Sequence, residues 1–308
     1  MKTITMLKGA ACLLCLTAGT ALADPATYAT PEAAVAAFVD ALNAQDQAAL
    51  LTVFGPESED LISSGNPRED AKARAQFLAD YQEIAQIVDD GEGRKELQVG
   101  RTRWPFPVTL VAVDGGWRFD PAAAREEILD RRIGANELDV IALLQRARGV
   151  QAAYRQVDYD GDGVMEFASS ILSDPGTRDG LYWPDEPGAP QSPIGPFIAQ
   201  AAADGISLDG VDQPPEPYFG YYYRILTKQG PAAPGGAYDY MVGGHMLAGY
   251  ALLAYPAEPE ETGVMTFMMG ENGVIYEADL GENTLDIAGK IEAFDPDPAQ
   301  GWKPLAGQ

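Results

Sequence analysis

The sequence predicts an α+β fold built from two units, and three observations support this prediction. Capping side chains followed directly by proline mark helix starts in the first half of the chain. Alternating apolar segments separated by glycine-containing turns predict strands near residue 110 and again after residue 217. Between these groups lies an acidic segment, Asp158 to Glu166, with the composition of a cation-binding loop.

The chain begins with the features of a secretory signal peptide. Lys2 and Lys8 supply the positive charge, Gly9 to Ala18 form a short apolar segment, and Ala21-Leu22-Ala23 fits a cleavage site of small residues. The apolar segment is too short to span a bilayer. We therefore expect cleavage after residue 23, a periplasmic or secreted protein, and no membrane span.

Cleavage would also remove both cysteines, Cys12 and Cys15, so the mature chain would have no disulfide. The remaining 285 residues (308 − 23) are enough for one or two domains. The formal charge of −25 becomes −27 once the two lysines of the signal are lost. Such an acidic surface repels nucleic acid and anionic membranes, so we expect neither as a partner.

Two amphipathic helices are expected in the first unit. Thr30-Pro31 starts the first, which extends to about Asn43. Asn66-Pro67 starts the second, which extends to about Val88, and Glu69 completes a capping box with the asparagine. The side chains expected to face inward are Val35, Phe38, Val39 and Leu42 in the first helix and Phe77, Tyr81, Ile84 and Val88 in the second.

A hairpin closes the first unit. Residues 108–113 and 117–119 have strand composition and flank Asp114-Gly115-Gly116, which predicts a tight turn. Asp120-Pro121 then starts another helix. We therefore assign residues 24–120 to the first unit and residues 121–308 to the second.

The second unit is expected to begin with two helices separated by a break at Ile133-Gly134. The first runs from Pro121 to Arg132. The second starts near Asn136, and its apolar positions at helical spacing are Ile141, Leu144, Ala147, Val150 and Tyr154. Residues 174–196 are rich in proline and glycine, and a loop of this length is either functional or covers a sheet edge.

Strands dominate the rest of the chain. Strand patterns cover residues 221–227, 247–255, 263–269 and 274–279, and Asn272-Gly273 predicts a tight hairpin between the last two. A closing helix is expected from Asn283 or Thr284, with Ile287, Ile291 and Phe294 facing inward. Together with the preceding helix, this pattern predicts a helix packed on an antiparallel sheet.

The acidic loop carries the most specific chemical signal in the chain. Asp158, Asp160 and Asp162 occupy alternate positions and Gly163 follows them, as in loops that bind Ca²⁺ through about six to eight oxygen ligands. The twelfth position of a helix-loop-helix calcium motif needs an acid, but here it is Ser169, so that motif is excluded.

A shorter pattern fits the loop better. With Glu166 at its ninth position, the segment resembles the D-x-D-x-D-G-x-x-D/E loops of calcium-binding hairpins and propeller repeats. That resemblance implies metal ligands at Asp158, Asp160, Asp162 and Glu166, together with the backbone carbonyl of Val164. We expect a structural Ca²⁺. The alternative is an acidic, glycine-rich turn that is merely solvated.

The sequence offers few catalytic groups. His245 is the single histidine, and in Gly243-Gly244-His245-Met246 it has the surroundings of a turn or edge residue. No G-x-S-x-G motif is present, and a mature chain with one histidine and no cysteine excludes a typical zinc site. A hydrolase that uses carboxylates alone remains an alternative. Among the aromatic residues, Trp183 is the best candidate for a ligand contact.

Six segments of the chain are similar to a known family. They are Phe119-Asp120-Pro121 with Arg125-Glu126-Glu127-Ile128, the segment from Arg132 to Leu138, the loop at Asp158, and the segments from Asp179 to Pro184, Ala233 to Tyr240 and Thr262 to Phe267. On these segments the chain resembles the bacterial domain of unknown function 2950 family. The resemblance spans most of the mature chain. It implies a secreted bacterial protein and no particular activity.

Two further resemblances concern the fold. Thr30 to Ala33, Phe38 to Leu42, Asp46 to Leu50 and Asp114 to Phe119 resemble the nuclear-transport-factor-2-like (NTF2-like) cone, here without the histidine of its enzymes. Asn136-Glu137, Ala152-Ala153-Tyr154, Gly220-Tyr221, Gly249-Tyr250 and Gly273 to Tyr276 resemble the globular domain of type IV pilins. The pilin leader and its long apolar helix are absent.

These patterns lead to one expected function and two alternatives. We expect a secreted or periplasmic, calcium-stabilised, non-enzymatic protein that binds an envelope protein or a glycan. The alternatives are the carboxylate-based hydrolase, acting on an envelope polymer, and a pilus-like structural subunit.

Overall fold

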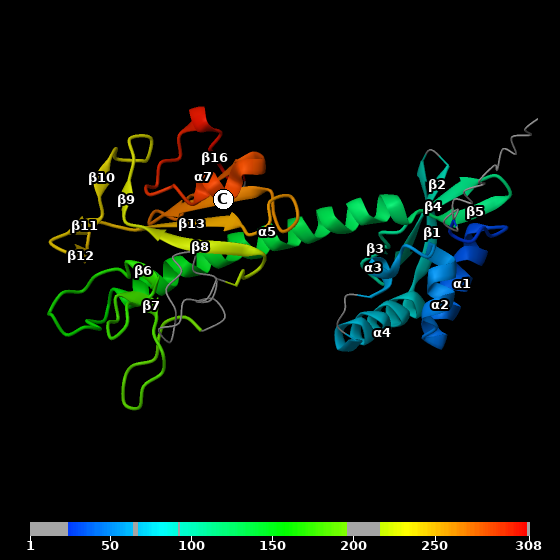
Figure 1. Ribbon diagram of the computed structural model, residues 1–308, viewed down its shortest axis with the longest axis horizontal. Coiled ribbons are helices and arrows are strands. Elements are labelled where there is room, and N and C mark those ends of the chain that lie inside the picture. The colour runs from blue at the N-terminus through cyan, green and yellow to red at the C-terminus, as the bar shows by residue number, and fades with distance from the viewer. Residues whose placement is uncertain (1–23, 64–66, 92, 196–215, 307–308) are drawn as a thin grey trace, which may run out of the picture. The chain divides into compact units, whose positions relative to one another are not determined.

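The structure, a computed structural model, describes residues 24–63, 67–91, 93–195 and 216–306 (Figure 1). The expected signal peptide, residues 1–23, and the expected capping box of Asn66 and Glu69 lie outside this description. Two compact units form, Met1–Glu127 and Ile128–Gln308. Each contains helices and an antiparallel sheet, which confirms the α+β class.

Four helices precede the sheet of the first unit. Thr30 caps α1 as expected, because its Oγ1 accepts a hydrogen bond from the N–H of Ala33 at 3.2 Å. Asp46 caps α2 in the same way, accepting from Ala49 at 3.0 Å. The helices are α1 (Pro31–Ala44), α2 (Gln47–Phe54), α3 (Glu59–Ile62) and α4 (Pro67–Glu83).

The sheet of the first unit is antiparallel throughout and has the strand order β1-β2-β4-β5, with β3 also paired to β2. Val113 pairs with Gly116 across Asp114 and Gly115, so the expected hairpin is confirmed. Gly115 has a φ of 92°, a value that glycine adopts without strain. The strands are β1 (Ala85–Gly91), β2 (Arg94–Val99), β3 (Trp104–Pro105), β4 (Leu110–Val113) and β5 (Gly116–Phe119).

The expected length of the second helix was wrong. Helix α4 ends at Glu83, and Val88 lies in strand β1 instead. Ile84, expected to face inward, is 42% exposed. The neighbouring β-branched residues Ile87 and Val88 favour a strand, and β1 pairs with β2 along its length. Cross-strand hydrogen bonds therefore outweigh the helical spacing of the apolar side chains.

An aromatic cluster forms the core of the first unit. The ring of Phe38 on α1 lies 5.1 Å from Phe54, 5.3 Å from Phe77, 5.0 Å from Phe106 and 5.8 Å from Phe119, centroid to centroid. Several of these pairs have the edge-to-face geometry that aromatic rings prefer. The cluster joins three helices to the sheet.

The second unit is built on helix α5. Its full extent is Pro121–Tyr154, so the expected break at Ile133-Gly134 is wrong. A Cβ on Gly134 would meet no atom within 4 Å, and an exposed glycine within a helix costs only about 1 kcal/mol relative to alanine. Strong helix formers on both sides, such as Arg132 and Ala135, are enough to continue the helix.

A five-stranded antiparallel sheet packs on α5, with the order β16-β15-β14-β13-β8 (Figure 1). Val140 and Leu144 of the helix share one buried cluster with Leu253 and Phe267 of the sheet. The expected helix on an antiparallel sheet is therefore present. The strands are β8 (Tyr221–Leu226), β13 (Ala251–Pro256), β14 (Met265–Gly270), β15 (Ile275–Asp279) and β16 (Lys303–Pro304).

Polar side chains of α5 hold the β13–β14 connection. Glu137 Oε1 accepts hydrogen bonds from the N–H groups of Val264 and Met265, both at 2.9 Å. Asn136 Nδ2 donates to the carbonyl of Thr262 at 2.8 Å. These bonds satisfy backbone groups that enter β14, so they set where the strand begins relative to the helix.

Near its C-terminal end α5 also binds the chain that follows the acidic loop. Gln151 is fully buried, its Nε2 donates to the carbonyl of Ala168, and its Oε1 accepts from the N–H of the same residue, both at 3.0 Å. One side chain thus satisfies both backbone groups of Ala168. These two bonds hold the chain that follows the acidic loop, at Ala168, against α5.

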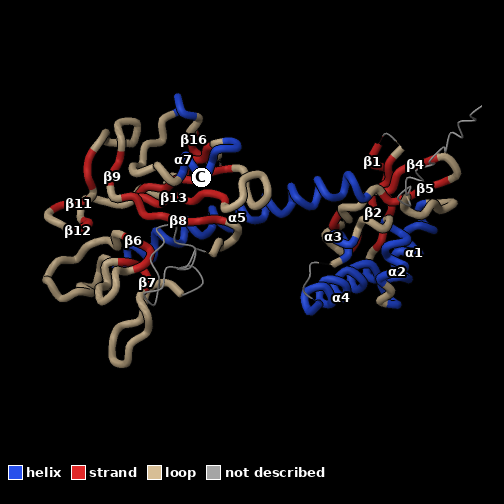
Figure 2. Tube along the Cα trace, in the orientation of Figure 1, coloured by secondary structure: helices blue, strands red, loops and turns tan. Residues whose placement is uncertain are grey.

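The described part of this unit also contains three short strand pairs and long loops (Figure 2). β6 pairs in parallel with β7, whereas the other two pairs are antiparallel. Within the described residues, no helix has both the length and the apolarity that a bilayer crossing requires. The strands are β6 (Ser170–Leu172), β7 (Gly180–Tyr182), β9 (Lys228–Gln229), β10 (Tyr238–Asp239), β11 (Met241–Val242) and β12 (His245–Met246).

The expected closing helix was wrong in length. Helix α7 covers only Thr284–Ala288, and Ile287 is 42% exposed instead of facing inward. Phe294 is buried, but in extended chain whose backbone bonds to Lys228 and Gly230. This pairing with a segment distant in sequence ends the helix early. Two 3₁₀ turns, η1 (Gly281–Asn283) and η2 (Pro298–Gln300), flank the region.

The role of Gln151 can be tested by replacement with leucine, which has a similar volume. We expect Gln151→Leu to lower the free energy of unfolding by about 2 kcal/mol or more, because two buried backbone groups lose their partner. Urea unfolding measured by circular dichroism checks this. Gln156→Leu, at an exposed position, is the control. Equal stability of the two variants would contradict the structural role.

Continuity of α5 can be tested at Gly134. We expect Gly134→Ala to raise the free energy of unfolding by about 0.5–1 kcal/mol, because alanine favours the helix and the added methyl group has open space. Gly263→Ala is the contrasting variant, because its Cβ would lie 2.0 Å from the hydroxyl oxygen of Tyr221. If Gly134→Ala were destabilising in thermal unfolding, the helix would break there.

Candidate metal centre

The acidic loop follows directly after α5 and is curled by its own side chains. Asp158 accepts hydrogen bonds from the N–H of Gly161 at 2.8 Å and from that of Gly163 at 2.9 Å, through different carboxylate oxygens. Asp160 accepts from the N–H of Asp162 at 3.3 Å. Both glycines have positive φ, 79° and 87°, which the tight curl requires. Local sequence alone is therefore enough to shape the loop.

This curl brings three carboxylates together. One oxygen each from Asp158, Asp160 and Asp162 lies within 4.8 Å of the other two. In the described part of the chain, no other three acidic, histidine or cysteine side chains meet this spacing. Because Ca²⁺ binds oxygen at about 2.3–2.6 Å, two of its ligands are at most about 5 Å apart. The spacing of the three oxygens fits a single ion.

Asp158 has the charge state that a metal ligand needs. The N–H groups of Gly163 and Gly161 hold the pKa of its carboxyl below the usual range, because they stabilise the ionised form. The side chain is therefore an anion at neutral pH. Its pattern of two backbone bonds also leaves lone pairs on both oxygens for a cation.

Val164 and Glu166, the other two expected ligands, differ in their position relative to the three carboxylates. The N–H of Val164 donates to Asp162 Oδ1 at 2.7 Å, which keeps this residue next to the three carboxylates. Glu166 lies outside that group. Its Oε2 accepts from the N–H of Met246 at 2.6 Å, and its Oε1 lies 3.5 Å from Nδ1 of His245. Glu166 thus links the loop to strand β12.

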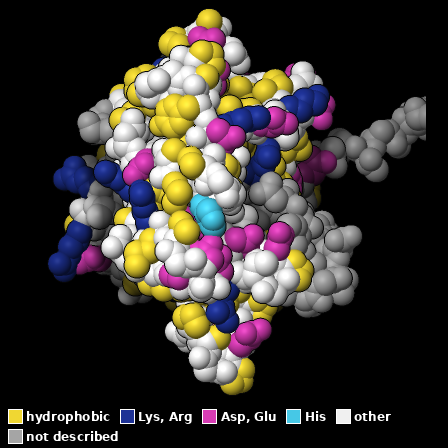
Figure 3. All heavy atoms as spheres, turned by 90° about the vertical axis from the view of Figure 1, so that its left-hand side faces the viewer, with side chains coloured by type: hydrophobic (Ala, Val, Ile, Leu, Met, Phe, Trp, Pro, Cys, Tyr) yellow, Lys and Arg dark blue, Asp and Glu magenta, His cyan; other side chains and the backbone are white. Residues whose placement is uncertain are grey.

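The sequence did not predict that His245 lies beside the acidic loop. Its Nδ1 lies 3.4 Å from Asp162 Oδ2 as well as near Glu166, and its side chain is 29% exposed. In Figure 3 the histidine is visible at the surface, with acidic side chains beside it. A gap of about eighty residues separates it from Glu166, so no spacing rule links the two. Only the folded chain brings them together.

The loop is also held from its other side. The N–H of Phe167 donates to the carbonyl of Met246 at 3.0 Å, and the guanidinium of Arg155 lies 4.5 Å from the centre of the Phe167 ring. Tyr159 packs its ring 4.9 Å from that of Tyr154. The acidic loop is exposed, yet it is held at both ends. Its first residues follow α5, and its last residue is bonded to β12.

Trp183, the best aromatic candidate for a ligand contact in the sequence, is a buried residue. It is 4% exposed, and its Nε1 donates to the carbonyl of Pro190 at 2.9 Å. A tryptophan with its polar atom already bonded contributes packing rather than recognition.

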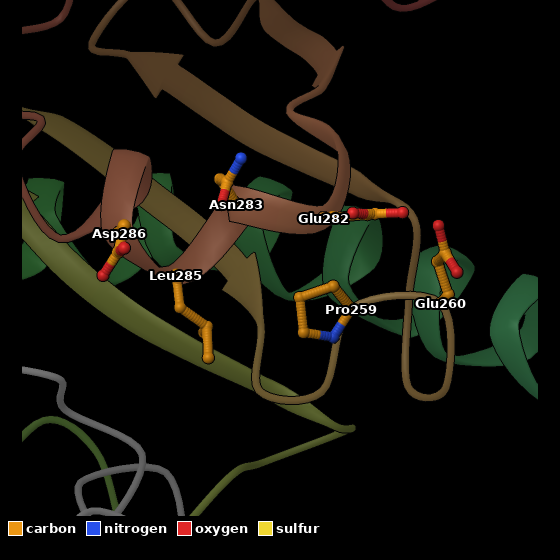
Figure 4. A pocket seen from close by; sticks show the side chains of 6 residues that line it. All are labelled: Pro259, Glu260, Glu282, Asn283, Leu285 and Asp286. Atoms are coloured by element: carbon orange, nitrogen blue, oxygen red, sulfur yellow. The ribbon is translucent and has the colours of Figure 1, made fainter.

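Acidic side chains also line a pocket of about 390 Å³ beside α7 (Figure 4). The carboxylates of Glu260 and Glu282 point toward one another there, while Asp286 lies farther along the helix. Within the described residues, its acids do not provide three oxygens at metal-ligand spacing. The Asp158–Glu166 loop is therefore the better candidate.

The link through Glu166 can be tested by truncation. Met246 is fully buried, so Glu166→Ala leaves its N–H without a partner and is expected to lower the free energy of unfolding by about 1–3 kcal/mol in calcium-free buffer. Chemical unfolding is the measurement. Glu282→Ala, at an exposed glutamate, is expected to change stability by less than about 0.5 kcal/mol. Equal effects of the two substitutions would contradict the link.

Comparison with known proteins gives one positive result. The family described as "Protein of unknown function (DUF2950)" matches residues 25–305. The curated proteins and the solved structures compared with the chain contain no match. Since the matched region includes both units and the acidic loop, and the sequence resemblance pointed to the same family, the chain belongs to the DUF2950 family.

Proposed function

We propose that the protein is an exported, non-enzymatic binding protein whose second unit is stabilised by one Ca²⁺ in the Asp158–Glu166 loop. Its partner would be an envelope protein or a glycan. The observation that carries the proposal is the spacing of the Asp158, Asp160 and Asp162 carboxylates, within 4.8 Å of one another. Three anions at this distance repel each other, and a divalent ion in the loop removes that repulsion.

Stabilisation follows from where the loop is attached. Its first residues continue from α5, its last residue, Glu166, is bonded to β12, and Ala168, two residues farther on, is bonded to Gln151. An ion that binds only the folded loop would therefore stabilise the packing of helix and sheet by mass action. Glu166 would complete the ligand set through a water molecule, which allows it to keep its hydrogen bond to the N–H of Met246.

Export is proposed from the sequence at residues 1–23, which has the charge, apolar length and small residues of a cleavable signal. A net charge of −25 suits a protein that remains soluble outside the cytoplasm. Calcium is also more available there than inside cells. The proposed metal site and the proposed location therefore support each other.

A binding role is favoured over catalysis by the surroundings of the single histidine. The nearest polar partners of His245 are Asp162 and Glu166, so its contacts belong to the loop rather than to a nucleophile. The hydrolase and pilus-subunit alternatives remain predictions from the sequence.

We further propose that the two units are related to known folds. Packing of α1, α2 and α4 against an antiparallel sheet supports an NTF2-like cone in the first unit. Packing of α5 on an antiparallel sheet supports a likeness to the globular domain of type IV pilins in the second.

Calcium dependence is tested with a chain that starts at residue 24. We expect Ca²⁺ at about one hundred times its dissociation constant to stabilise the protein by about 2.7 kcal/mol, which corresponds to a rise in melting temperature of about 5 °C or more relative to chelator. Differential scanning calorimetry measures this rise.

The matched variants are Asp160→Asn, in the loop, and Asp286→Asn, beside α7. The first is expected to abolish the rise and the second to preserve it. Equal melting temperatures of the unmodified chain in calcium and in chelator would disprove the metal site. A full calcium response in Asp160→Asn would show that the ion binds elsewhere.

A further inference from the structure

A pocket of about 460 Å³ lies directly beside the acidic loop. Three segments line it: Tyr159 and Asp160 of the loop, the end of β6 with the residues that follow it (172–178), and the end of β7 with the residues that follow it (Tyr182, Trp183, Pro184 and Glu186). Its volume falls in the range of about 300–1,000 Å³ that is typical of sites for small molecules. Of these residues, only Asp160 is also a proposed metal ligand.

Aromatic rings form one part of the pocket. Trp183 is 4% exposed, and its ring lies 5.0 Å from that of Tyr159, which in turn lies 4.9 Å from Tyr154. The three rings pack against one another at tilted angles, and Tyr159 and Trp183 also line the pocket, so this wall is closely packed. Tyr182 is only half-buried and also lines the pocket. Part of an aromatic face is therefore open to a ligand.

Hydrogen-bonding groups form the remaining lining. Ser173 and Thr177 supply hydroxyl groups, and Asp174 and Glu186 supply exposed carboxylates. Arg178 holds two of the lining segments together, because its Nη1 donates to the carbonyl of Tyr159 at 3.4 Å and its Nη2 lies 3.6 Å from a carboxylate oxygen of Glu186. Polar groups and aromatic rings therefore share one small cavity.

The charge of the lining narrows the ligand class. Asp160, Asp174 and Glu186 face a single guanidinium, that of Arg178, so the lining is net negative and repels anions. A purely apolar ligand would leave these carboxylates without hydrogen bonds. A neutral ligand with many hydroxyl donors and one apolar ring face satisfies both the carboxylates and the open tyrosine face. Saccharides have this chemistry.

The pocket and the candidate metal centre share Asp160. Its carboxylate is one of the three closely spaced groups of the loop, and the same residue lines the pocket. An ion that fixes Asp160 would also fix the adjacent Tyr159, whose ring supports Trp183. A loop held in one conformation would therefore also hold the pocket wall in place, through Tyr159 and Trp183.

We propose that this pocket binds one or two units of a neutral saccharide and that Ca²⁺ in the acidic loop strengthens the binding by fixing Asp160 and Tyr159 in its wall. The inference rests on the proposed function, and it assigns the glycan partner to a specific site. It adds Tyr182, Asp174 and Arg178 as recognition residues.

The test is ligand-observed saturation-transfer NMR on the chain from residue 24, with cellobiose, maltose, trehalose and N,N′-diacetylchitobiose at millimolar concentration. We expect at least one disaccharide to bind in the presence of Ca²⁺. Chelator and Asp160→Asn are each expected to weaken that binding severalfold. Tyr182→Ala is expected to weaken it about tenfold, from the loss of stacking on the ring.

Tyr238→Ala is the matched control, because this tyrosine is 44% exposed in β10 and does not line the pocket. It is expected to bind like the unmodified chain. Asp174→Ala, at an exposed position on the pocket rim, provides a second variant if Tyr182→Ala gives no cooperative melting transition. It is expected to weaken binding as well.

Several results would overturn the inference. Absence of binding by every disaccharide, while Ca²⁺ still raises the melting temperature, would disprove the saccharide site and leave the metal site standing. Binding that Tyr182→Ala and Asp174→Ala both leave unchanged would place the sugar elsewhere. Binding of N-acetyl-lysine amide without any disaccharide would assign the pocket to a cationic peptide. Equal affinity in calcium and in chelator would disprove the coupling.

Discussion

The packing of helix α5 on the antiparallel sheet is the interaction on which the second unit depends. Apolar burial supplies most of its free energy, through residues such as Val140, Leu144 and Leu253. The burial of apolar side chains is not directional, however, and would allow the helix to shift along the sheet. Glu137 and Gln151 fix its position, because each binds backbone groups of a particular segment. The acidic loop lies between Tyr154, where the helix ends, and Ala168, which Gln151 binds.

The loop combines local and distant constraints. Bonds from the Asp158, Asp160 and Asp162 carboxylates to nearby N–H groups curl it, and they would form in almost any context. Its position in the molecule depends instead on Glu166 and its bond to β12. The same tertiary contact brings His245 beside the acids. Asp160 of the loop also lines the neighbouring pocket. The proposed metal and ligand sites are therefore one connected region.

The errors in the predicted elements share a physical cause. Apolar spacing indicated a longer α4 and a longer closing helix, yet Val88 pairs in β1 and Phe294 pairs beside Lys228. Val88 pairs with the adjacent strand β2, whereas Phe294 pairs with a segment distant in sequence. In both cases inter-strand hydrogen bonds outweigh a local periodicity that fits a helix. At Gly134 the error was the reverse, because one glycine costs too little to break a long helix.

By itself the sequence determined the features that local chemistry decides. These are the capped start of α1, the hairpin at Asp114-Gly115, the strands around Tyr221–Leu226 and Met265–Gly270, and the curled acidic loop. Only the tertiary structure decided the partners of Glu166, the place of His245 and the pocket beside Tyr182. The contacts of Glu166 and His245 join segments about eighty residues apart, and the pocket joins three separate segments between Tyr159 and Glu186. Their meeting depends on the packing of a whole helix and sheet, which no short pattern of residues records.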